Sequence, residues 1–553
     1  MKRMITYITG KNYPASEAAH IRGNHLLGLM PVLTDPEGEG IKRYIYQDFH
    51  DALVKHPEMR CYFWLGLMTV IVTSNPKDVE YLLKTGRTIE HQEEHENVEG
   101  EENIKPLTLL HTRTEVFKNV NSLVGEGIFT ASGALRENLR KVYHHNFQNT
   151  GLLQEYLKVM QAFATQQLGM QATRNLREVC LYYATNLMLA TIVKVSSEDL
   201  DSINTPLIEA IRTLMQEVMN FSNIIKWNVP GTLRKLMYMG HEYTSASEFK
   251  DMIQNRLRDI FGKYVSNPEQ NSFVDSIKHL KPNDQVNVMS EVVLLFFAGV
   301  DSTAGTLDFA VRYLHRHPEI LNSIRAEFAK IEQDRETSQE ITLQQYSASK
   351  IPLMNAFLYE VWRLSPLFPL LTRSSTQTTY LGKLEVEPRT MILISLYTMS
   401  RDPRLWGDDA NQFSPSRFLD EEGKLKNLTE EQKKCYIPFG LGRQSCVAEK
   451  FALYAILVFI GELTKYNFSL NLVETENEAG PSSDLDTSPT SSAKNTDLFF
   501  FRMDKGTPKL VDAEITLHKR SVAANSATMF GGSSSETQVT TTTQQKVKLG
   551  NRA

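Results

Sequence analysis

A single cysteine lies between a glycine-rich turn and an apolar helix in the stretch PFGLGRQSCVAEKFA, residues 438–452. Gly440 and Gly442 let the backbone turn tightly and come close to a flat ligand. Cys446 follows at a predicted helix N-terminus, where free amide groups and the helix dipole favour a thiolate. A thiolate on a rigid loop is a good axial ligand for haem iron. The alternative is a buried structural cysteine, because free cysteine is among the most buried residue types.

A glutamate and an arginine three residues apart, Glu360 and Arg363, occur in the otherwise apolar segment YEVWRLSP. Residues at this spacing share one face of a helix, so the two side chains can pair. Most such pairs are solvated surface bridges that contribute little to stability. A buried pair needs further partners, and Arg417 in SPSRF is a candidate for one of them.

An acid and two hydroxyls interrupt a long apolar run in AGVDST. Ala298 and Gly299 leave the helix surface thin, and a glycine there costs about 1 kcal/mol of helix stability. Asp301 is followed by Ser302 and Thr303. The gap could hold a small ligand, and the acid and hydroxyls could relay a proton to it. A helix bend with locally bonded hydroxyls is the alternative.

The elements that must position these residues are mostly helical. Apolar residues recur with helical spacing between residues 133 and about 265 and again over 289–317, 354–365 and 449–466. Strand patterns with turn residues between them occupy 61–76, 370–397 and 498–520, the last of which is typical of a hairpin. The predicted fold class is therefore mainly α with small β-sheets.

Composition and charge exclude several classes of function. The chain has 553 residues, of which 41% are apolar and 23% charged, as in an ordinary globular protein. The formal net charge is −5, so a nucleic acid is not expected as a partner. The four cysteines are scattered and form no CxxC pair, which argues against a zinc site or a disulfide framework and suits a reducing compartment.

Composition also divides the chain. Residues 1–40 are expected to form an N-terminal segment without a clear transmembrane anchor, and residues 41–520 a single domain. Within that domain, residues 474–497 have the low complexity of a disordered insertion. Residues 521–553 are expected to form a disordered tail rich in Ser, Thr and Gln. No integral anchor is expected, whereas peripheral contact with a membrane stays open.

Taken in order, these motifs resemble the cytochrome P-450 family of haem-thiolate monooxygenases. The ordered set consists of GALRENLRK, AGVDST, ExxR, PSRF and FGLGRQSC, within residues 40 to 520. Each motif alone is weak or moderate, but the ordered set is highly specific. The resemblance implies the cytochrome P-450 fold with haem b (iron protoporphyrin IX) as cofactor. The haem would lie between the long central (I) helix and the cysteine loop with the (L) helix that follows it.

The resemblance also implies roles for residues at matching positions. Cys446 would be the axial ligand of the haem iron, and Phe439 and Gly442 would shape the loop beneath the haem. A buried structural charge network that supports this loop would consist of Glu360, Arg363 and Arg417.

Other matching positions would contact the haem edge, the oxygen or the substrate. Arg140 and Arg373 match positions that contact haem propionates, a role that suits the guanidinium group. The residues that would guide protons to bound oxygen are Asp301, Ser302 and Thr303. Candidate pocket residues, which flank these positions, are Phe297, Ala298, Leu370 and Leu371.

Four positions depart from the family pattern. Gln444 stands where an Arg or His usually contacts a propionate, and Arg443 lies one residue earlier as an offset candidate. Ala448 replaces a usual Gly, and Ser302 replaces a Thr whose methyl group would restrict its rotamer. Arg136 stands where Trp or His is common, and its charge could compensate for Gln444.

The implied activity is the insertion of one oxygen atom from O2 into a small apolar organic substrate, namely a lipid, sterol or xenobiotic. Electrons would come from NADPH through a separate reductase or a ferredoxin. The alternatives are a peroxide isomerase or dehydratase that needs no reductase, and a non-catalytic haem or lipid carrier. The resemblance favours the surface of the endoplasmic reticulum membrane, with the cytoplasm and the mitochondrion as further options.

Overall fold

The computed structural model describes part of the chain, and the structural statements below concern that part. The described residues are 13–21, 44–65, 68–84, 111–112, 127–129, 131, 133–170, 172–219, 246–269, 272–280, 287–335, 341–375, 377–388, 390–472, 501–504, 507–510 and 513–520. The acidic run 89–103, the insertion 474–497 and the tail 521–553 lie outside these residues, as does most of the segment 1–40.

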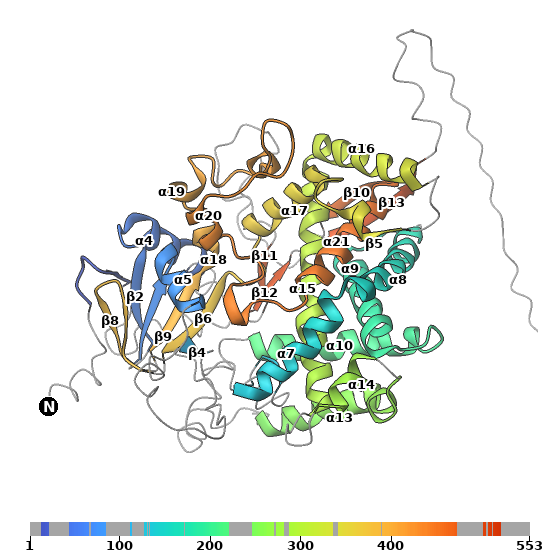
Figure 1. Ribbon diagram of the computed structural model, residues 1–553, viewed down its shortest axis with the longest axis horizontal. Coiled ribbons are helices and arrows are strands. Elements are labelled where there is room, and N and C mark those ends of the chain that lie inside the picture. Colours follow the sequence, from blue (N-terminus) through green and yellow to red (C-terminus); the bar gives the residue numbers. More distant parts are fainter. Residues whose placement is uncertain are drawn as a thin grey trace, which may run out of the picture.

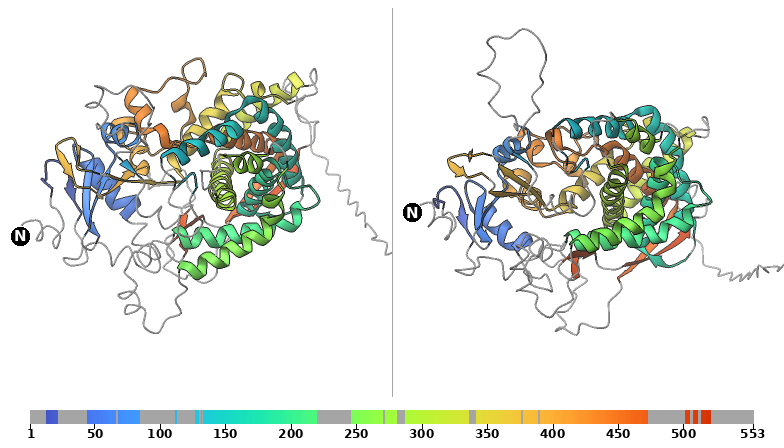
Figure 2. Two further views of the ribbon diagram at one scale, coloured as in Figure 1. Left: turned by 60° about the horizontal axis from the view of Figure 1, so that its bottom comes forward. Right: turned by 90° about the horizontal axis from the view of Figure 1, so that it is seen from below.

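Helices make up most of the described chain and pack around one long helix, α15 (Val288–Arg316), which runs through the middle of the helical part in Figures 1 and 2. The other long helices are α7 (Gly133–Gln148), α8 (Thr150–Gly169), α9 (Leu176–Met188), α10 (Leu200–Met219), α13 (Ala246–Ser266), α16 (Pro318–Arg335), α17 (Pro352–Leu364) and α21 (Glu449–Leu463). The short ones are η1 (Tyr44–Asp48), α4 (Phe49–Lys55), α5 (Pro76–Lys84), η3 (Leu189–Val193), α14 (Phe273–Lys278), η4 (Leu343–Tyr346), α18 (Leu396–Met399), α19 (Pro403–Trp406), η5 (Pro415–Phe418), α20 (Glu430–Cys435) and η6 (Gly442–Gln444).

Helix α15 is central because it is apolar on most of its faces. Asn287 caps its N-terminus by accepting a hydrogen bond from the Ser290 amide at 3.2 Å, and Pro318 begins the next helix. Among the described helices, α15 alone is long and apolar enough to cross a bilayer, yet 72% of its most apolar window is buried inside the protein. We therefore interpret it as the core helix of the domain.

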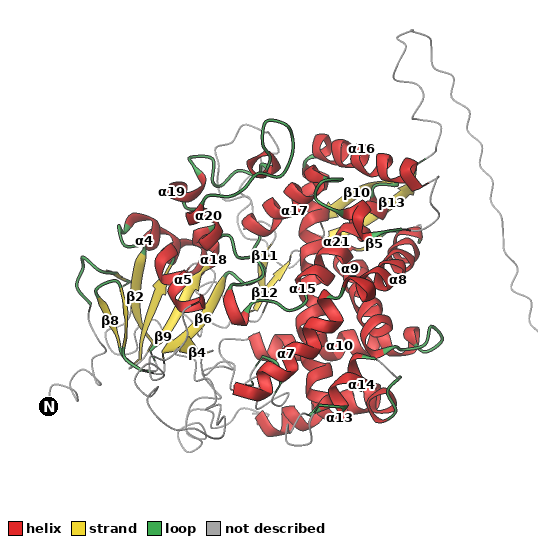
Figure 3. Ribbon diagram, viewed as in Figure 1, coloured by secondary structure: helices red, strands yellow, loops and turns green. Residues whose placement is uncertain are grey.

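The largest sheet lies at the opposite end of the molecule from most of the long helices (Figure 3), and the short helices α4 and α18 pack against it. Its strand order is β1-β2-β3-β9-β6-β4, with the β1–β2 and β3–β9 pairs parallel. The two adjacent strands predicted within 61–76 form its antiparallel hairpin. The strands are β1 (Ala19–His20), β2 (Arg60–Leu65), β3 (Met68–Thr73), β4 (His111–Thr112), β6 (Leu370–Ser375) and β9 (Met391–Ser395).

Three small sheets complete the described strands. They are β10-β13-β5, β11-β12 and β7-β8, with bounds β5 (Arg174–Asn175), β7 (Thr379–Leu381), β8 (Leu384–Val386), β10 (Tyr466–Leu472), β11 (Phe501–Asp504), β12 (Thr507–Leu510) and β13 (Ala513–Lys519). The hairpin predicted over 498–520 is right for β11 and β12 only, because β13 pairs with β10 instead. The predicted class, mainly α with small β-sheets, is confirmed.

Candidate functional site

The loop that presents Cys446 is folded back on itself between α20 and α21. The Cys446 amide donates to the Phe439 carbonyl at 2.7 Å, which closes the loop. Gly440 and Gly442 have φ angles of +76° and +72°, which favour glycine. A Cβ at Gly442 would lie 2.3 Å from the Leu83 carbonyl oxygen of α5. The tight turn therefore depends on glycine for both its conformation and its packing.

Cys446 is an exposed residue, unlike the other three cysteines. Desolvation nevertheless raises its pKa, and the amide of Ala448 offsets this only in part. The helix after it begins at Glu449, so Cys446 precedes the first turn instead of starting it. The expectation that the helix N-terminus would favour a thiolate is therefore not met by the polypeptide alone. A bound metal ion ionises a coordinating thiol outright.

The backbone at Ala448 explains how alanine replaces the usual glycine. Its φ of −106° and ψ of 20° lie in a region open to any L-residue. Phe439 is held from the other side, with its ring edge-on to Trp362 of α17 at a centroid distance of 4.9 Å. The loop thus joins α17 to α21 without backbone strain at Ala448.

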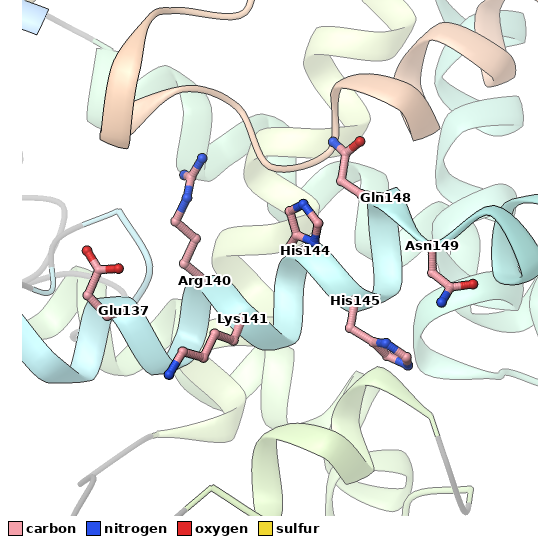
Figure 4. A pocket seen from close by; sticks show the side chains of 7 residues that line it. All are labelled: Glu137, Arg140, Lys141, His144, His145, Gln148 and Asn149. Atoms are coloured by element: carbon pink, nitrogen blue, oxygen red, sulfur yellow. The ribbon is translucent and has the colours of Figure 1, made fainter. Parts of the chain in front are cut away.

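Side chains from α7 hold the same loop. Arg140 donates to the carbonyl and the hydroxyl of Ser445 at 3.0 and 3.1 Å, and Arg136 donates to the Arg443 carbonyl at 3.1 Å. Gln148 donates to the backbone carbonyl that follows Cys446, at 2.8 Å. Figure 4 shows Arg140 and Gln148 pointing from α7 towards the loop. The motif GALRENLRK thereby lies directly against the cysteine loop.

Two arginines near this loop are buried without a negative partner in the part of the chain that the structure describes. Arg136 is 6% exposed and Arg373, on β6, is 7% exposed. Burial and the charge of Arg136 lower the pKa of Arg373 to about 10. No described carboxylate lies within ion-pair distance of either guanidinium, whereas Arg443 is half-exposed and lies 3.6 Å from Glu137. Two buried unpaired cations fit a ligand with two carboxylates, as haem has in its propionates.

The side chain of Gln444 also indicates that a polar ligand binds next to the cysteine loop. Its amide oxygen is buried and has no hydrogen-bond partner among the described residues. A buried unpaired acceptor is costly, and such groups are expected to find a partner when a ligand binds.

Glu360 and Arg363 form a buried ion pair, with Arg363 donating to both carboxylate oxygens at 2.6 and 2.7 Å. Arg363 also donates to the carbonyls of Ser400, Ala410 and Gln412. Its remaining donors are thus satisfied by the irregular stretch between α18 and η5. The pair is a fully bonded network and not a solvated surface bridge.

Arg417 reaches Glu360 only at 3.5 Å and is held mainly by Asp409, at 2.8 and 3.0 Å. Sequence reasoning missed Asp409. The acidic pair in LWGDDANQF was the available signal, but no spacing rule connects it to a residue eight positions away on an irregular segment.

Asp301 is paired with Arg177 of α9, a residue that sequence reasoning also missed. An arginine in the apolar helix LREVCLYYATNLM was the available signal. The Ser302 hydroxyl donates to the Ala298 carbonyl at 2.6 Å, and Thr303 is buried. The acid and the first alcohol are therefore both engaged within the helix pair, and α15 continues unbroken through the motif.

The side chain of Met188, on α9, occupies the space beside Gly299. A Cβ at Gly299 would lie 3.0 Å from the Met188 methyl group. Glycine at this position permits close packing of α15 against Met188 of α9, and the gap for a small ligand stays a prediction.

The candidate pocket residues come from two elements. Phe297 and Ala298 of α15 are half-buried. Leu370 and Leu371 are neighbours on β6, and they pack into clusters on opposite faces of the sheet. Because adjacent strand residues point to opposite faces, at most one of this pair can line a given pocket. Phe368, just before the strand, is 49% exposed and was missed.

The cysteine loop, the buried charge network and two buried guanidiniums without a described carboxylate partner could together hold a haem. The cytochrome P450 family model matches residues 41–492. The chain belongs to the cytochrome P450 family, whose members are haem-thiolate monooxygenases that bind haem b, as the motifs indicate.

Several curated relatives carry the same family name. The chain is 24% identical to cytochrome P450 71A26 of Arabidopsis thaliana over 55% of this chain and 70% of the relative. It is 26% identical to cytochrome P450 52-M1 of Starmerella bombicola over 64% of this chain and 70% of the relative. It is 34% identical to cytochrome P450 2U1 of Bos taurus over 32% of this chain, which spans only 31% of the bovine protein.

Proposed function

We propose that this protein inserts one oxygen atom from O2 into a small apolar organic substrate of the lipid, sterol or xenobiotic class, with electrons from NADPH through a separate reductase or a ferredoxin. The observation that carries the proposal is an exposed Cys446 in a loop held by α7, together with two buried guanidiniums, those of Arg136 and Arg373, that have no carboxylate partner among the described residues. Haem, when bound, supplies the oxygen chemistry, and the protein holds and orients it.

The chain's own residues would hold the haem at three places. Cys446 would ligate the iron, with Phe439 and Gly442 setting the height of the loop. Arg136 and Arg373 would take the propionates. The remaining supports that we assign are Arg140, Arg443, Glu360, Arg363 and Arg417.

Proton transfer would need local rearrangement. Asp301 can give a proton to a ligand only when its carboxylate turns from Arg177. The Ser302 hydroxyl, which now donates to the Ala298 carbonyl, would have to rotate to relay it. Thr303 is buried next to this pair and would act only through such movement.

The substrate would meet mostly apolar surface. Phe297, Ala298 and Phe368 are partly exposed. Together with either Leu370 or Leu371, they would line the substrate pocket. Apolar lining with few polar groups is typical of sites for small organic molecules.

The test begins with the reduced, carbon-monoxide-bound protein, which should show the red-shifted Soret band of thiolate-ligated haem. Cys446→Ser should abolish that band. With a reductase, apolar substrates should then stimulate NADPH consumption and yield an oxygenated product. A normal Soret band, with neither NADPH consumption nor an oxygenated product across a broad substrate panel, would contradict the monooxygenase activity. Only the haem-binding site would then be supported.

A second candidate is a peroxide isomerase or dehydratase on the same fold. It is favoured by the acid and alcohol of α15, which are bonded to Arg177 and to the helix backbone. Turnover of a fatty-acid hydroperoxide without NADPH would select this candidate. The carrier alternative predicts that Asp301→Asn and Ser302→Ala change no product.

A redox partner would dock beside the cysteine loop. A shallow cavity of about 450 Å³ lies on this side of α7 (Figure 4), and Glu137 is its one carboxylate. Its other lining residues, which give it a basic character, are Arg140, Lys141, His144, His145, Gln148 and Asn149. This charge supports an acidic docking face on the reductase or ferredoxin.

We further infer a domain over residues 41–520. The match of the family model to residues 41–492 supports the first boundary. We also infer peripheral contact with the endoplasmic reticulum membrane. This inference rests on family membership alone.

A further inference from the structure

Glu291 is a buried acid that the haem site does not use. It lies in the first turn of α15, and its side chain is 0% exposed. The Tyr143 hydroxyl of α7 donates to one carboxylate oxygen at 2.7 Å, and the Ile128 amide donates to the other at 3.0 Å. One carboxyl group therefore joins three segments: α15, α7 and residues 127–129.

Residues 127–129 sit directly on this carboxyl group. A Cβ at Gly127 would lie 2.6 Å from the Glu291 carboxylate and 2.4 Å from the Leu294 side chain. Ile128, which follows, is buried in the main core cluster. Glycine at this position is what lets the segment cover Glu291 closely.

No described cation compensates the acid. Helix α14, which packs against both α7 and α15, presents the Phe273 ring edge-on to Tyr143 at 4.9 Å. Its charged residues are engaged elsewhere, since Asp275 pairs with His279 and Lys278 donates to a backbone carbonyl. Tyr143 is the only titratable group that contacts the carboxyl among the described residues.

Burial raises the pKa of Glu291 to about 7, although both hydrogen bonds oppose the shift. The neutral carboxyl can keep both contacts, because its carbonyl accepts from Ile128 and its hydroxyl donates to Tyr143. The ionised carboxylate is costly in this apolar surrounding and is better solvated when the cover lifts.

We propose that Glu291 is a pH-sensitive lock that ties residues 127–129 and α7 to α15. Ionisation of the carboxyl favours opening of the segment 127–129. Protonation favours the closed position, in which the Ile128 amide donates to Glu291. Helix α7 also carries Arg136 and Arg140, which hold the cysteine loop. Opening or closing of residues 127–129 is thus linked, through α7, to the hydrogen bonds that hold the cysteine loop. The lock does not depend on the oxygenation reaction and would operate equally in a haem carrier.

Amide hydrogen exchange on the haem-loaded, full-length protein tests the lock. For the peptide that contains Ile128, the protection factor, corrected for intrinsic exchange, should fall about tenfold between pH 6 and pH 8. Glu291→Gln keeps the shape and removes the charge, so its protection factor should stay level over this range. Glu327→Gln is the matched control. Like Glu291, Glu327 has a pKa raised by burial, and it accepts hydrogen bonds from two backbone amides of α17. It should retain the fall at Ile128.

An equal fall in wild type and in Glu291→Gln would overturn the proposal, as would a level profile in wild type. If Glu291→Gln does not fold, Tyr143→Phe decides the matter. Loss of the hydroxyl removes a hydrogen bond that lowers the pKa of Glu291, so the fall should move to higher pH. An unchanged midpoint in Tyr143→Phe would contradict the lock.

Discussion

At the scale of single residues, the candidate site contains positive charges that have no negative partner among the described residues. Arg136 and Arg373 are almost fully buried, and the charge of Arg136 helps to lower the pKa of Arg373. Unpaired buried charges are costly, so they are expected where a ligand supplies the opposite charge. The buried amide oxygen of Gln444 likewise has no hydrogen-bond partner among the described residues.

Arg373→Met should therefore act in opposite directions on two measurements. The haem-free protein should gain roughly 1 kcal/mol or more in urea unfolding, because an unpaired buried charge is removed. The same variant should lose haem faster, as followed by transfer of haem to an acceptor protein. Arg256→Met, at a half-exposed side chain of α13 that pairs with Glu209, is the control and should change both little. A destabilised haem-free Arg373→Met would contradict this account.

At the scale of elements, the cysteine loop is held by contacts to α5, α7, α17 and α21. Of these, the contact to α5 leaves the least room, because Gly442 packs against the Leu83 carbonyl. Gly423 offers a matched comparison. It has a similar φ of +74°, but nothing lies within 4 Å of the position that a Cβ would take.

Gly442→Ala should consequently displace the loop, whereas Gly423→Ala should cost only backbone strain of about 1 kcal/mol. We expect Gly442→Ala to destabilise the protein by several times that amount in urea unfolding, and to shift the Soret spectrum of the haem-loaded protein. Gly423→Ala should leave the spectrum unchanged. Equal stability losses in the two variants would argue that strain alone, and not the contact with α5, sets the loop.

Local geometry explains which parts of the site could be predicted from the sequence. The Glu360–Arg363 pair follows from helix periodicity alone, and the glycines of the cysteine loop follow from the turn that they must make. Partners distant in the chain carry no such signal. Arg177 meets Asp301 only because α9 packs on α15, and nothing local to either residue specifies that packing.

At the scale of the whole molecule, the same limit applies to the fold. The order of the motifs is enough to predict the family and its mainly helical fold, because each motif belongs to a different element. Strand β13 was assigned to a local hairpin, and it pairs with β10 across the chain instead, with Tyr466 opposite Lys519. Long-range strand pairing depends on the packed core and not on turn residues.

The pH dependence of global stability also belongs to the whole molecule, since several groups contribute with opposite signs. Burial lowers the pKa of His50 and of His315, which adds stability that is lost as the pH falls. Burial raises the pKa of Glu291 to about 7 and also raises that of Glu327. Stability from a raised carboxyl pKa is fully present below the unfolded value near 4.5 and is lost as the pH rises through the folded value.

Because these terms oppose one another, only a difference between variants isolates the carboxyl of Glu291. Between about pH 5 and pH 8, wild type should lose roughly 2 to 3 kcal/mol of unfolding free energy relative to Glu291→Gln. The relative gain of the variant should develop mainly between about pH 5 and pH 7, where the carboxyl is ionised in the unfolded chain but still protonated in the folded protein, and should level off above pH 7. Urea unfolding of both proteins at four or more pH values measures it. A constant difference across the range would mean that the folded and unfolded proteins bind the same number of protons at this carboxyl, and the raised pKa of Glu291 would then be wrong.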